Sequence, residues 1–322
     1  MKVKMSMINS ELRAFGWIFK LLNPTFTESR IRIFAWLNRK FLRGKTDKNL
    51  NCSEQWILRD DNSRMRICIF KSKENSAKVP GILWMHGGGY GMGVPEQGVG
   101  MAKAFINKKQ CVMIAPEYRL SIDAPYPAAL DDCHTALLWM KNNMESLGIN
   151  DSQIFIGGDS AGGGLAAALS LYVRDKKEVN IAFQMPLYPM LDDRMQTESA
   201  TDNNAPVWNS KSNYYGWKLY LGELFGKDNV PEYAAPARAT NYSNLSPTAT
   251  FVGDLEPFRD ETILYVENLR KAGVKVSFRI FEGCYHAFEQ VCPKAEISNS
   301  AIEFIISEYA FAVENYFAEQ TI

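Results

Sequence analysis

The sequence predicts an α/β fold with a mostly parallel central sheet flanked by helices. Short apolar runs bounded by turn residues alternate with helix-forming segments over residues 80–190, and the alternation resumes over 248–317. Parallel strands need crossover connections, usually helices, so the alternation implies helices on both faces of the sheet. At 322 residues the chain is also long enough to bury such a sheet.

The N-terminal part precedes this alternation. Apolar residues three or four apart predict an amphipathic helix over 5–22, ended by Asn23-Pro24, and a second helix over 31–41. We expect both helices to cover a pocket. Anchoring on a membrane surface is the alternative, which a narrow apolar stripe and a polar face of mixed charge disfavour.

The other elements follow from apolar runs and from the turn residues between them. Strands are expected at residues 54–59, 65–71, 80–85, 111–115, 154–156, 181–187, 248–252 and 276–281. Helices are expected at residues 96–107, 126–146, 165–174, 260–272 and 295–317. An aromatic-rich segment interrupts the alternation and predicts an insertion above the sheet. The predicted parts are an N-terminal part of a helical cap (1–50), a first core part (51–189), a cap insertion (190–236) and a second core part (237–322).

Composition excludes several classes of protein. Lysine plus arginine equals aspartate plus glutamate, 36 each, so nucleic acid is not an expected partner. The chain has no run of 18 apolar residues and no secretory leader pattern, which predicts no transmembrane helix or other stable membrane anchor. Six cysteines without paired spacing indicate reduced thiols in a cytoplasmic protein, with neither a metal site nor a cofactor expected.

The segment 154–164, I-F-I-G-G-D-S-A-G-G-G, carries the first chemical motif. Ser160 lies where an apolar strand turns abruptly into a helix, and small residues at 158, 161 and 162 allow the turn to close. This is the G-x-S-x-G nucleophile elbow, which presents a serine oxygen above a sheet.

A serine hydroxyl needs an adjacent base to become a nucleophile. Only three histidines are present. His286 follows the expected strand 276–281 and is the predicted base. His134 lies inside an expected helix, and His86 is assigned to supporting the glycine loop that follows it.

The third member should be a carboxylate after the strand that ends at residue 252, which gives the chain order serine, acid, histidine. Asp254, Glu256 and Asp260 all qualify, and the residues alone do not choose among them.

The run His86-Gly87-Gly88-Gly89 follows a strand, where backbone N–H groups of glycines can receive a developing oxyanion. Together with the serine elbow, in this order along an α/β chain, the glycine run is a specific indication of acyl-transfer chemistry.

The chain resembles the hormone-sensitive lipase family of α/β-hydrolases, in particular its bacterial esterases. The matching segments are H-G-G-G at 86–89, Y-R-L at 118–120, P-Y-P-A-A-L-D-D at 125–132, G-D-S-A-G-G at 158–163, E-P-F-R-D-E at 256–261 and Tyr285-His286. The resemblance implies the α/β-hydrolase fold with a helical cap. It implies Ser160 as nucleophile, His286 as base and the amides of Gly88, Gly89 and Ala161 as the oxyanion hole. The family's acid is usually aspartate, and its position here holds Glu256.

Two further expectations complete the site. Gly87 and Asp159 are assigned, with His86, to supporting the glycine loop. Aromatic residues suggest an apolar substrate pocket, for which Tyr90, Trp208 and Tyr214 are the candidates.

The predicted function is hydrolysis of short- to medium-chain carboxylic esters through an acyl-enzyme. Two alternatives are an amidase or deacetylase with the same residues and a non-catalytic protein that binds small molecules. Phosphate binding is weaker, because no G-x-x-x-x-G-K-[ST] is present. The partner is a small-molecule ester, and a homodimer is left open.

Overall fold

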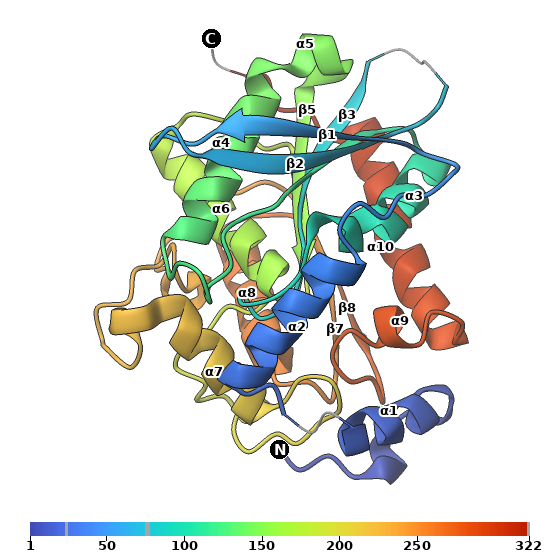
Figure 1. Ribbon diagram of the computed structural model, residues 1–322, viewed down its shortest axis with the longest axis vertical. Coiled ribbons are helices and arrows are strands. Elements are labelled where there is room, and N and C mark those ends of the chain that lie inside the picture. Colours follow the sequence, from blue (N-terminus) through green and yellow to red (C-terminus); the bar gives the residue numbers. More distant parts are fainter. Residues whose placement is uncertain (23–24, 75–77, 321–322) are drawn as a thin grey trace.

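The computed structural model describes residues 1–22, 25–74 and 78–320. Figure 1 shows a central sheet with helices on both sides. The predicted helix stop at Asn23-Pro24 lies outside the described residues.

Within these residues, eight strands form one sheet in the order β1-β2-β4-β3-β5-β6-β7-β8. Strands β3 to β8 run parallel, whereas β2 is antiparallel to both β1 and β4. The predicted mostly parallel sheet is therefore confirmed. The strands are β1 (Asn51–Leu58), β2 (Arg64–Lys71), β3 (Val79–Met85), β4 (Val112–Pro116), β5 (Ile149–Asp159), β6 (Phe183–Leu187), β7 (Thr248–Gly253) and β8 (Val276–Phe281).

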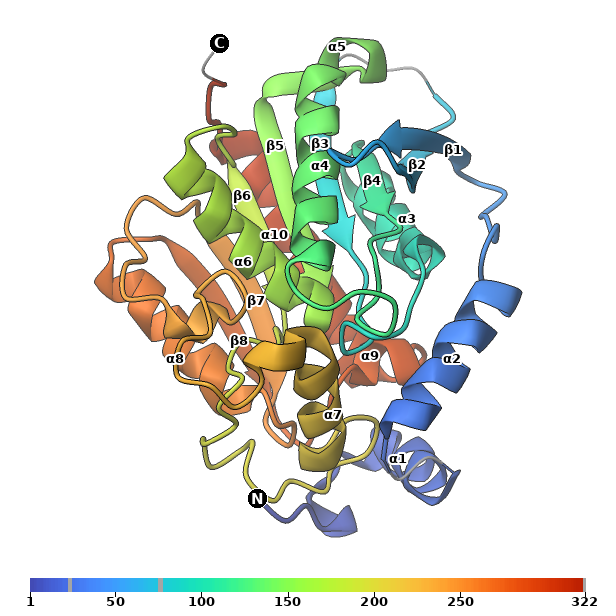
Figure 2. The ribbon, with the colours of Figure 1, turned by 60° about the vertical axis from the view of Figure 1, so that its left-hand side comes forward.

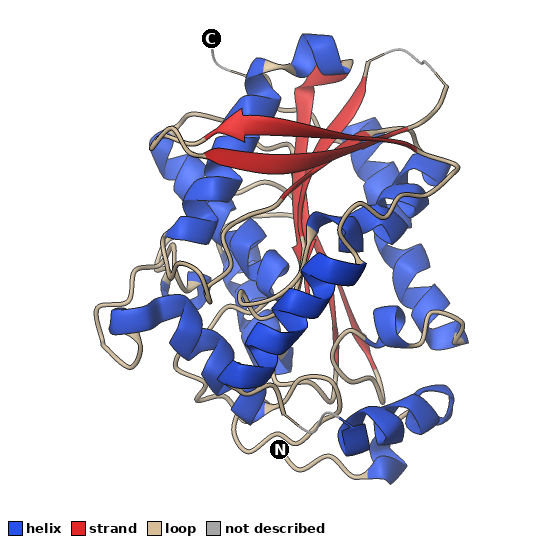
Figure 3. Cartoon of the chain, in the orientation of Figure 1, coloured by secondary structure: helices blue, strands red, loops and turns tan. Residues whose placement is uncertain are grey.

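Helices cover both faces of the sheet, as Figures 2 and 3 show. The α-helices are α1 (Ser10–Leu22), α2 (Glu28–Phe41), α3 (Val99–Lys108), α4 (Ala128–Asn142), α5 (Met144–Leu147), α6 (Ala161–Lys176), α7 (Ser210–Leu221), α8 (Arg259–Lys271), α9 (Phe288–Val291) and α10 (Glu296–Asn315). Short 3-10 turns lie at Met5–Met7, Pro95–Gly98, Gly222–Leu224 and Pro236–Arg238.

Alternating side chains of β3 divide the core into two layers. Leu83 and Met85 pack in one apolar cluster with α4 and α6, whereas Ile82 and Trp84 pack in another with α3 and α10. This alternation is the period-2 geometry of a strand that is buried on both faces. The sheet is thereby held between two helical layers, and its strand ends are fixed in position.

Helices α1, α2 and α7 gather at the lower end of the molecule in Figures 1 and 2, where the parallel strands end. Helix α2 contacts α7, and the Phe26 amide donates to the Ser212 hydroxyl at 2.9 Å. The division into cap and core at residues 50, 189 and 236 stays a prediction. Among the described residues, no helix is both long and apolar enough to cross a membrane.

The N-terminal helix is shorter than predicted. The predicted span 5–22 is a 3-10 turn at Met5–Met7 followed by α1 from Ser10. The Asn9 amide between them donates to the Gly283 carbonyl at 2.9 Å. The Asn9 amide therefore bonds to a distant segment, instead of to the carbonyl four residues earlier as it would in a continuous helix.

Candidate active site

Ser160 occupies a strained turn between β5 and α6. Its backbone has φ 57° and ψ −118°, in the left-handed half of conformational space that non-glycine residues avoid. The Ser160 amide donates to the Leu187 carbonyl at 3.0 Å, and its carbonyl accepts from the amides of Gly164 at 2.9 Å and Met190 at 3.1 Å. These bonds hold the serine in the geometry of a nucleophile elbow.

Glycine is required beside this serine. A Cβ added at Gly162 would lie 2.1 Å from the Met85 carbonyl oxygen, and one at Gly158 would lie 2.5 Å from the Gly162 carbonyl oxygen. Both neighbours are backbone atoms that cannot move aside. The small residues predicted from the sequence therefore allow helix and strand to approach closely.

Ser160, His286 and Glu256 form one chain of hydrogen bonds. His286 Nε2 lies 2.8 Å from Ser160 Oγ, and His286 Nδ1 is hydrogen-bonded to Glu256 Oε2. The three side chains are nearly inaccessible, with exposed fractions of 6 %, 3 % and 0 %. The second Glu256 oxygen accepts the Gly253 amide at 2.9 Å, which fixes the carboxylate beside the imidazole.

The structure separates the three carboxylates that the sequence left open. Asp254 Oδ1 accepts the Cys284 amide at 3.2 Å. Asp260 pairs with Arg259 at 2.7 Å and accepts the Ser199 amide at 2.8 Å. Of these three carboxylates, Glu256 alone has a recorded hydrogen bond to His286.

Aromatic rings surround the imidazole of His286. The ring centroids of Phe258 and Tyr188 lie 5.0 and 5.1 Å away, both edge to face, and that of Trp208 lies 6.4 Å away. These rings exclude water, which strengthens the hydrogen bonds between the histidine and its partners.

His86 supports the glycine loop, as its position in the sequence suggested. Its Nδ1 lies 2.8 Å from the Gly87 carbonyl oxygen, and its ring stacks on Tyr118 at 4.2 Å. The Tyr118 hydroxyl donates to the His86 carbonyl at 2.7 Å. Burial lowers the pKa of His86 to about 4, so the imidazole is neutral at neutral pH.

Asp159 supports the same loop from the elbow, because its Oδ2 accepts the Gly87 amide at 3.1 Å. Gly88 and Gly89 have φ values of 123° and 58°. A Cβ at Gly88 would lie 2.2 Å from the Met92 carbonyl oxygen, and one at Gly89 would lie 2.3 Å from the Trp208 ring. The loop thus passes where only glycine fits.

Three amides at this place have no recorded protein acceptor in the described parts of the chain: those of Gly88, Gly89 and Ala161. Ala161 begins α6, and the first N–H groups of a helix lack intrahelical partners and favour negative charge. These amides are available to an anionic ligand, in agreement with the oxyanion hole that the resemblance implies.

A polar network beside His286, which runs from the surface into the core, was not predicted from the sequence. Gln290 Nε2 donates to Asp159 Oδ2 at 3.1 Å and to the Tyr188 hydroxyl at 2.9 Å, and that hydroxyl donates to Glu289. The network joins the support of the glycine loop to the segment after His286. The sequence places two polar residues shortly after the histidine, but their partners lie about 100 positions or more away.

Glu289 is 3 % exposed, and burial raises the pKa of its carboxyl group to about 8. In the unfolded chain a glutamate has a pKa of about 4.3, so between these two values only the folded state holds the proton. The free energy of unfolding therefore falls as pH rises through this window. We expect Glu289→Gln, which keeps the acceptor for Tyr188, to remove this dependence.

Thermal unfolding of the wild type and of Glu289→Gln at a series of pH values checks this expectation. The two melting temperatures should agree near pH 4 and diverge in favour of the variant toward pH 8. Melting curves that stay parallel over the whole range would contradict a neutral buried Glu289.

The structure gives the three candidate pocket residues different places. Trp208 lies against Gly89 and near His286. Tyr90 is fully buried, stacks on Tyr220 at 3.8 Å and donates to the Met190 carbonyl at 3.0 Å. These contacts correct its assignment to the pocket, because they place it in the core. Tyr214 is 42 % exposed on α7, and its recorded ring contacts are two aromatic neighbours, Tyr215 and Phe225.

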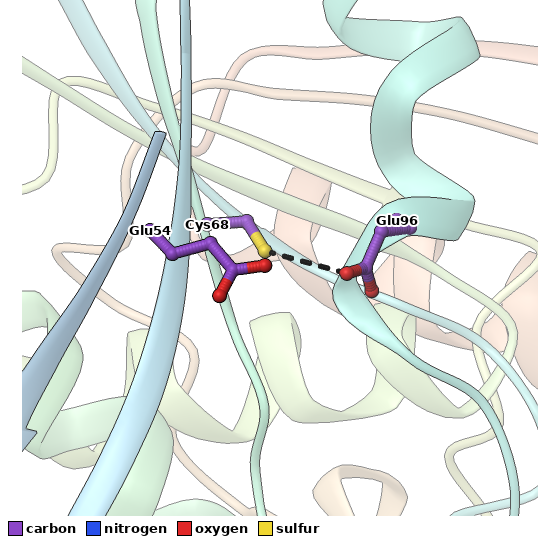
Figure 4. Close-up of side chains that lie close together, drawn as sticks. All are labelled: Glu54, Cys68 and Glu96. Atoms are coloured by element: carbon purple, nitrogen blue, oxygen red, sulfur yellow. Dashed lines mark hydrogen bonds between the residues drawn. The ribbon is translucent and has the colours of Figure 1, made fainter. Parts of the chain in front are cut away.

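Among the residues that the structure describes, one group of side chains has metal-ligand chemistry. Glu54, Cys68 and Glu96 come together between β1, β2 and the turn before α3, as Figure 4 shows. The Arg66 guanidinium fills this place. Its Nη1 lies 2.7 Å from Glu54, 2.8 Å from Glu96 and 3.2 Å from Cys68 Sγ. The Arg66 cation already pairs with both carboxylates, so we interpret the cluster as a partly buried ion-pair network.

Comparison with known proteins agrees with this geometry. The sequence family described as alpha/beta hydrolase fold matches residues 82–290, which hold the glycine loop, the serine elbow, the acid and the histidine. The chain belongs to the α/β-hydrolase family. This match supports the resemblance inferred from the motifs.

His134, the histidine inside α4, pairs with Glu178 at 2.7 Å and takes no part in the site.

Named members of the α/β-hydrolase family are similar over much of this chain. Esterase LipI of Mycobacterium tuberculosis is 32 % identical over 66 % of this chain and 67 % of its own length. An arylesterase of Saccharolobus solfataricus is 32 % identical over 64 % of this chain and 67 % of its own length. The structure of a bacterial heroin esterase superposes with a TM-score of 0.87 and 30 % identity, covering 97 % of this chain and 99 % of that one.

Proposed function

We propose that the chain is a serine carboxylesterase that hydrolyses short- to medium-chain acyl esters through Ser160, His286 and Glu256. The observation that carries the proposal is the pair of hydrogen bonds on His286, one to Ser160 Oγ at 2.8 Å and one to Glu256. A nucleophile, a base and an orienting acid in this order are the parts that acyl transfer requires. The esterase names of the relatives support an ester as the substrate.

The first half of the proposed reaction forms an acyl-enzyme. Ser160 Oγ attacks the carbonyl carbon of the ester while its proton passes to His286 Nε2, and Glu256 stabilises the resulting imidazolium through Nδ1–H. The carbonyl oxygen becomes an oxyanion and accepts hydrogen bonds from the loop and α6 amides. Collapse of this intermediate breaks the bond to the alcohol oxygen, which leaves with the proton from Nε2.

The second half releases the acid. A water molecule gives a proton to His286 Nε2 and attacks the acyl carbon. Collapse returns that proton to Ser160 Oγ and frees the carboxylic acid. Every group returns to its starting state, so the cycle consumes only ester and water.

The small accessible area at the serine supports the acyl-chain preference. Ser160 is 6 % exposed, and the rings of Trp208, Tyr188 and Phe258 lie around His286. An apolar, closely walled site accommodates a few methylene groups well, whereas a longer chain would have to displace these rings. Neutral esters are favoured over charged ones, because the aromatic walls would leave a charge without a partner.

A panel of p-nitrophenyl esters of graded acyl length tests this preference. We expect kcat/KM to be highest between acetyl and octanoyl esters and to fall by about tenfold or more at dodecanoyl, since the added methylene groups find no further space. The matched p-nitroanilides, measured in parallel, distinguish an esterase from an amidase. A rate that rises steadily to the longest acyl chain would overturn the proposed substrate range.

Labelling by a fluorophosphonate separates the enzyme from a non-catalytic binding protein. The reagent should modify the protein stoichiometrically at Ser160 and abolish ester hydrolysis, because only an activated serine reacts.

A cytoplasmic location also belongs to this proposal and is supported by the six cysteines, all of which are free thiols.

A further inference from the structure

The N-terminal segment differs in charge from the rest of the molecule. Residues 1–45 contain ten lysines and arginines and two glutamates, which gives a net charge of +8 in a chain whose overall net charge is zero. Four of these cations pair with carboxylates, namely Lys2, Arg32, Arg39 and Arg43. Positive charge nevertheless remains concentrated around α1 and α2.

Helix α1 presents apolar side chains on two sides. Its inner side is fixed to the core, because Leu12 is fully buried and its carbonyl accepts the Tyr285 hydroxyl at 3.2 Å. Gly16 lies in the same contact, since a Cβ there would lie 3.0 Å from the Tyr285 ring. The helix is thus held against the loop that carries His286, and its other side faces outward.

Large apolar side chains make up much of the outward side of α1, which also carries Ser10, Glu11 and Ala14. Five such side chains are 45–74 % exposed: Phe15, Trp17, Ile18, Leu21 and Leu22. Soluble monomers rarely expose so many neighbouring apolar groups, and a continuous patch indicates an interaction surface. In Figures 1 and 2 this helix lies at the lower edge of the molecule.

Basic side chains border this surface. Arg13 and Lys20 lie on α1 itself, and Arg13 lines a surface groove with Trp17 and Ile18. Apolar side chains with Trp among them and Lys or Arg at the border are the composition of helices that lie in a membrane interface.

We propose that the outer face of α1, formed by Phe15, Trp17, Ile18, Leu21 and Leu22, docks the protein reversibly on an anionic lipid membrane. The apolar side chains would enter the boundary between headgroups and acyl chains, and Arg13 and Lys20 on the same helix would face the lipid phosphates. Charge favours this occupant over a second copy of the chain, since two copies would bring two strongly basic segments together. On docking, the outer face of the helix would exchange contacts with water for contacts with lipid. The helix needs no rearrangement, because its inner side is already packed.

Sedimentation with large unilamellar vesicles tests the proposal. The full chain is mixed with vesicles of phosphatidylcholine containing 30 mol % phosphatidylglycerol, or of phosphatidylcholine alone, at low and at high salt. We expect binding to the anionic vesicles at low salt, a loss of at least fivefold in high salt and weak binding to the neutral vesicles. Trp17→Ser should weaken binding to the anionic vesicles by about tenfold, the factor for removing one buried aromatic side chain.

Trp56→Ser provides a matched control. Trp56 is 53 % exposed on β1, close to the 56 % of Trp17, but β1 lies at the opposite end of the molecule in Figure 1. This control variant should bind vesicles as the wild type does. Both variants should hydrolyse p-nitrophenyl acetate at the wild-type rate, since neither residue touches the site, so membrane docking can fail while the esterase proposal stands.

Three results would overturn the inference. One is a wild type that stays in the supernatant with anionic vesicles at low salt. Another is a Trp17→Ser variant that binds these vesicles as well as the wild type does. The third is a wild-type dimer, measured by light scattering, that Trp17→Ser converts to a monomer, because the face would then be a contact between two copies.

Discussion

Replacing Ser160 by alanine should lower kcat for p-nitrophenyl butyrate by a factor on the order of 10⁴ to 10⁶, with little change in KM. The substitution removes Oγ, the only atom of this side chain that bonds to His286, while the buried volume changes by a single oxygen. The strained backbone at φ 57° suits alanine no worse than serine, so the variant should fold. Initial rates at saturating ester, with circular dichroism as the check on folding, measure the effect.

Contamination by another esterase is the main risk in that measurement. The purified Ser160→Ala variant should therefore also refuse the fluorophosphonate label, which reports on the protein itself. Wild-type turnover by this variant would disprove the serine mechanism.

Glu256→Gln should lower kcat by a factor on the order of 10³ to 10⁴. Glutamine keeps the shape and can still accept the Gly253 amide, but its NH₂ group would face His286 Nδ1 and favour the imidazole tautomer that protonates Nε2. A histidine with Nε2 protonated cannot take the serine proton. The pH–rate profile and kcat of the variant measure this loss.

Asp254→Asn is the matched control for the acid. Asp254 lies two positions away and accepts the Cys284 amide, which an asparagine oxygen can also do. We expect its kcat to stay within about tenfold of the wild type. Equal losses in the two variants would remove the distinction that the hydrogen bonds draw between these carboxylates.

The fold was predictable because strands that are buried on both faces appear as short apolar runs. The segments 80–85, 248–252 and 276–281 are close to the observed β3, β7 and β8. Strand β5 begins at Ile149, five residues earlier than its apolar run, because Ile149 pairs with Val79 and the polar residues 150–152 continue the strand. Helix α9 is four residues long and too short to leave a period in the sequence.

The site was predictable to the extent that its geometry is local. The serine elbow and glycine loop are short segments whose backbone conformation depends on their own small residues. The choice of Glu256 over Asp254 and Asp260 depends on which side chain faces His286, 30 positions away, and spacing does not contain that information. The assignment of Tyr90 to the substrate pocket was wrong. Tyr90 follows the glycine loop in the sequence, but its side chain lies in the core.

The outer face of α1 shows a third limit. Periodicity identifies which residues share a side of a helix, and it predicted one apolar stripe. Leu12 of that stripe faces the core, but Phe15 and Leu22 of the same stripe lie on the outward side. Composition alone does not tell which of two apolar sides is covered, so the structure was needed to find the exposed one.

The hydrogen bond between Tyr285 and Leu12 spans 273 positions of the chain. During translation the ribosome completes α1 long before it makes the segment on which α1 docks. Until that segment is made, the inner residues of α1 stay unpacked. The contact between Leu12 and Tyr285 then forms slowly, because it closes a very long loop. Esterase activity should consequently appear late in biosynthesis, once the last βα unit has emerged from the ribosome. Until then the apolar residues of α1 are exposed and available for chaperones to bind.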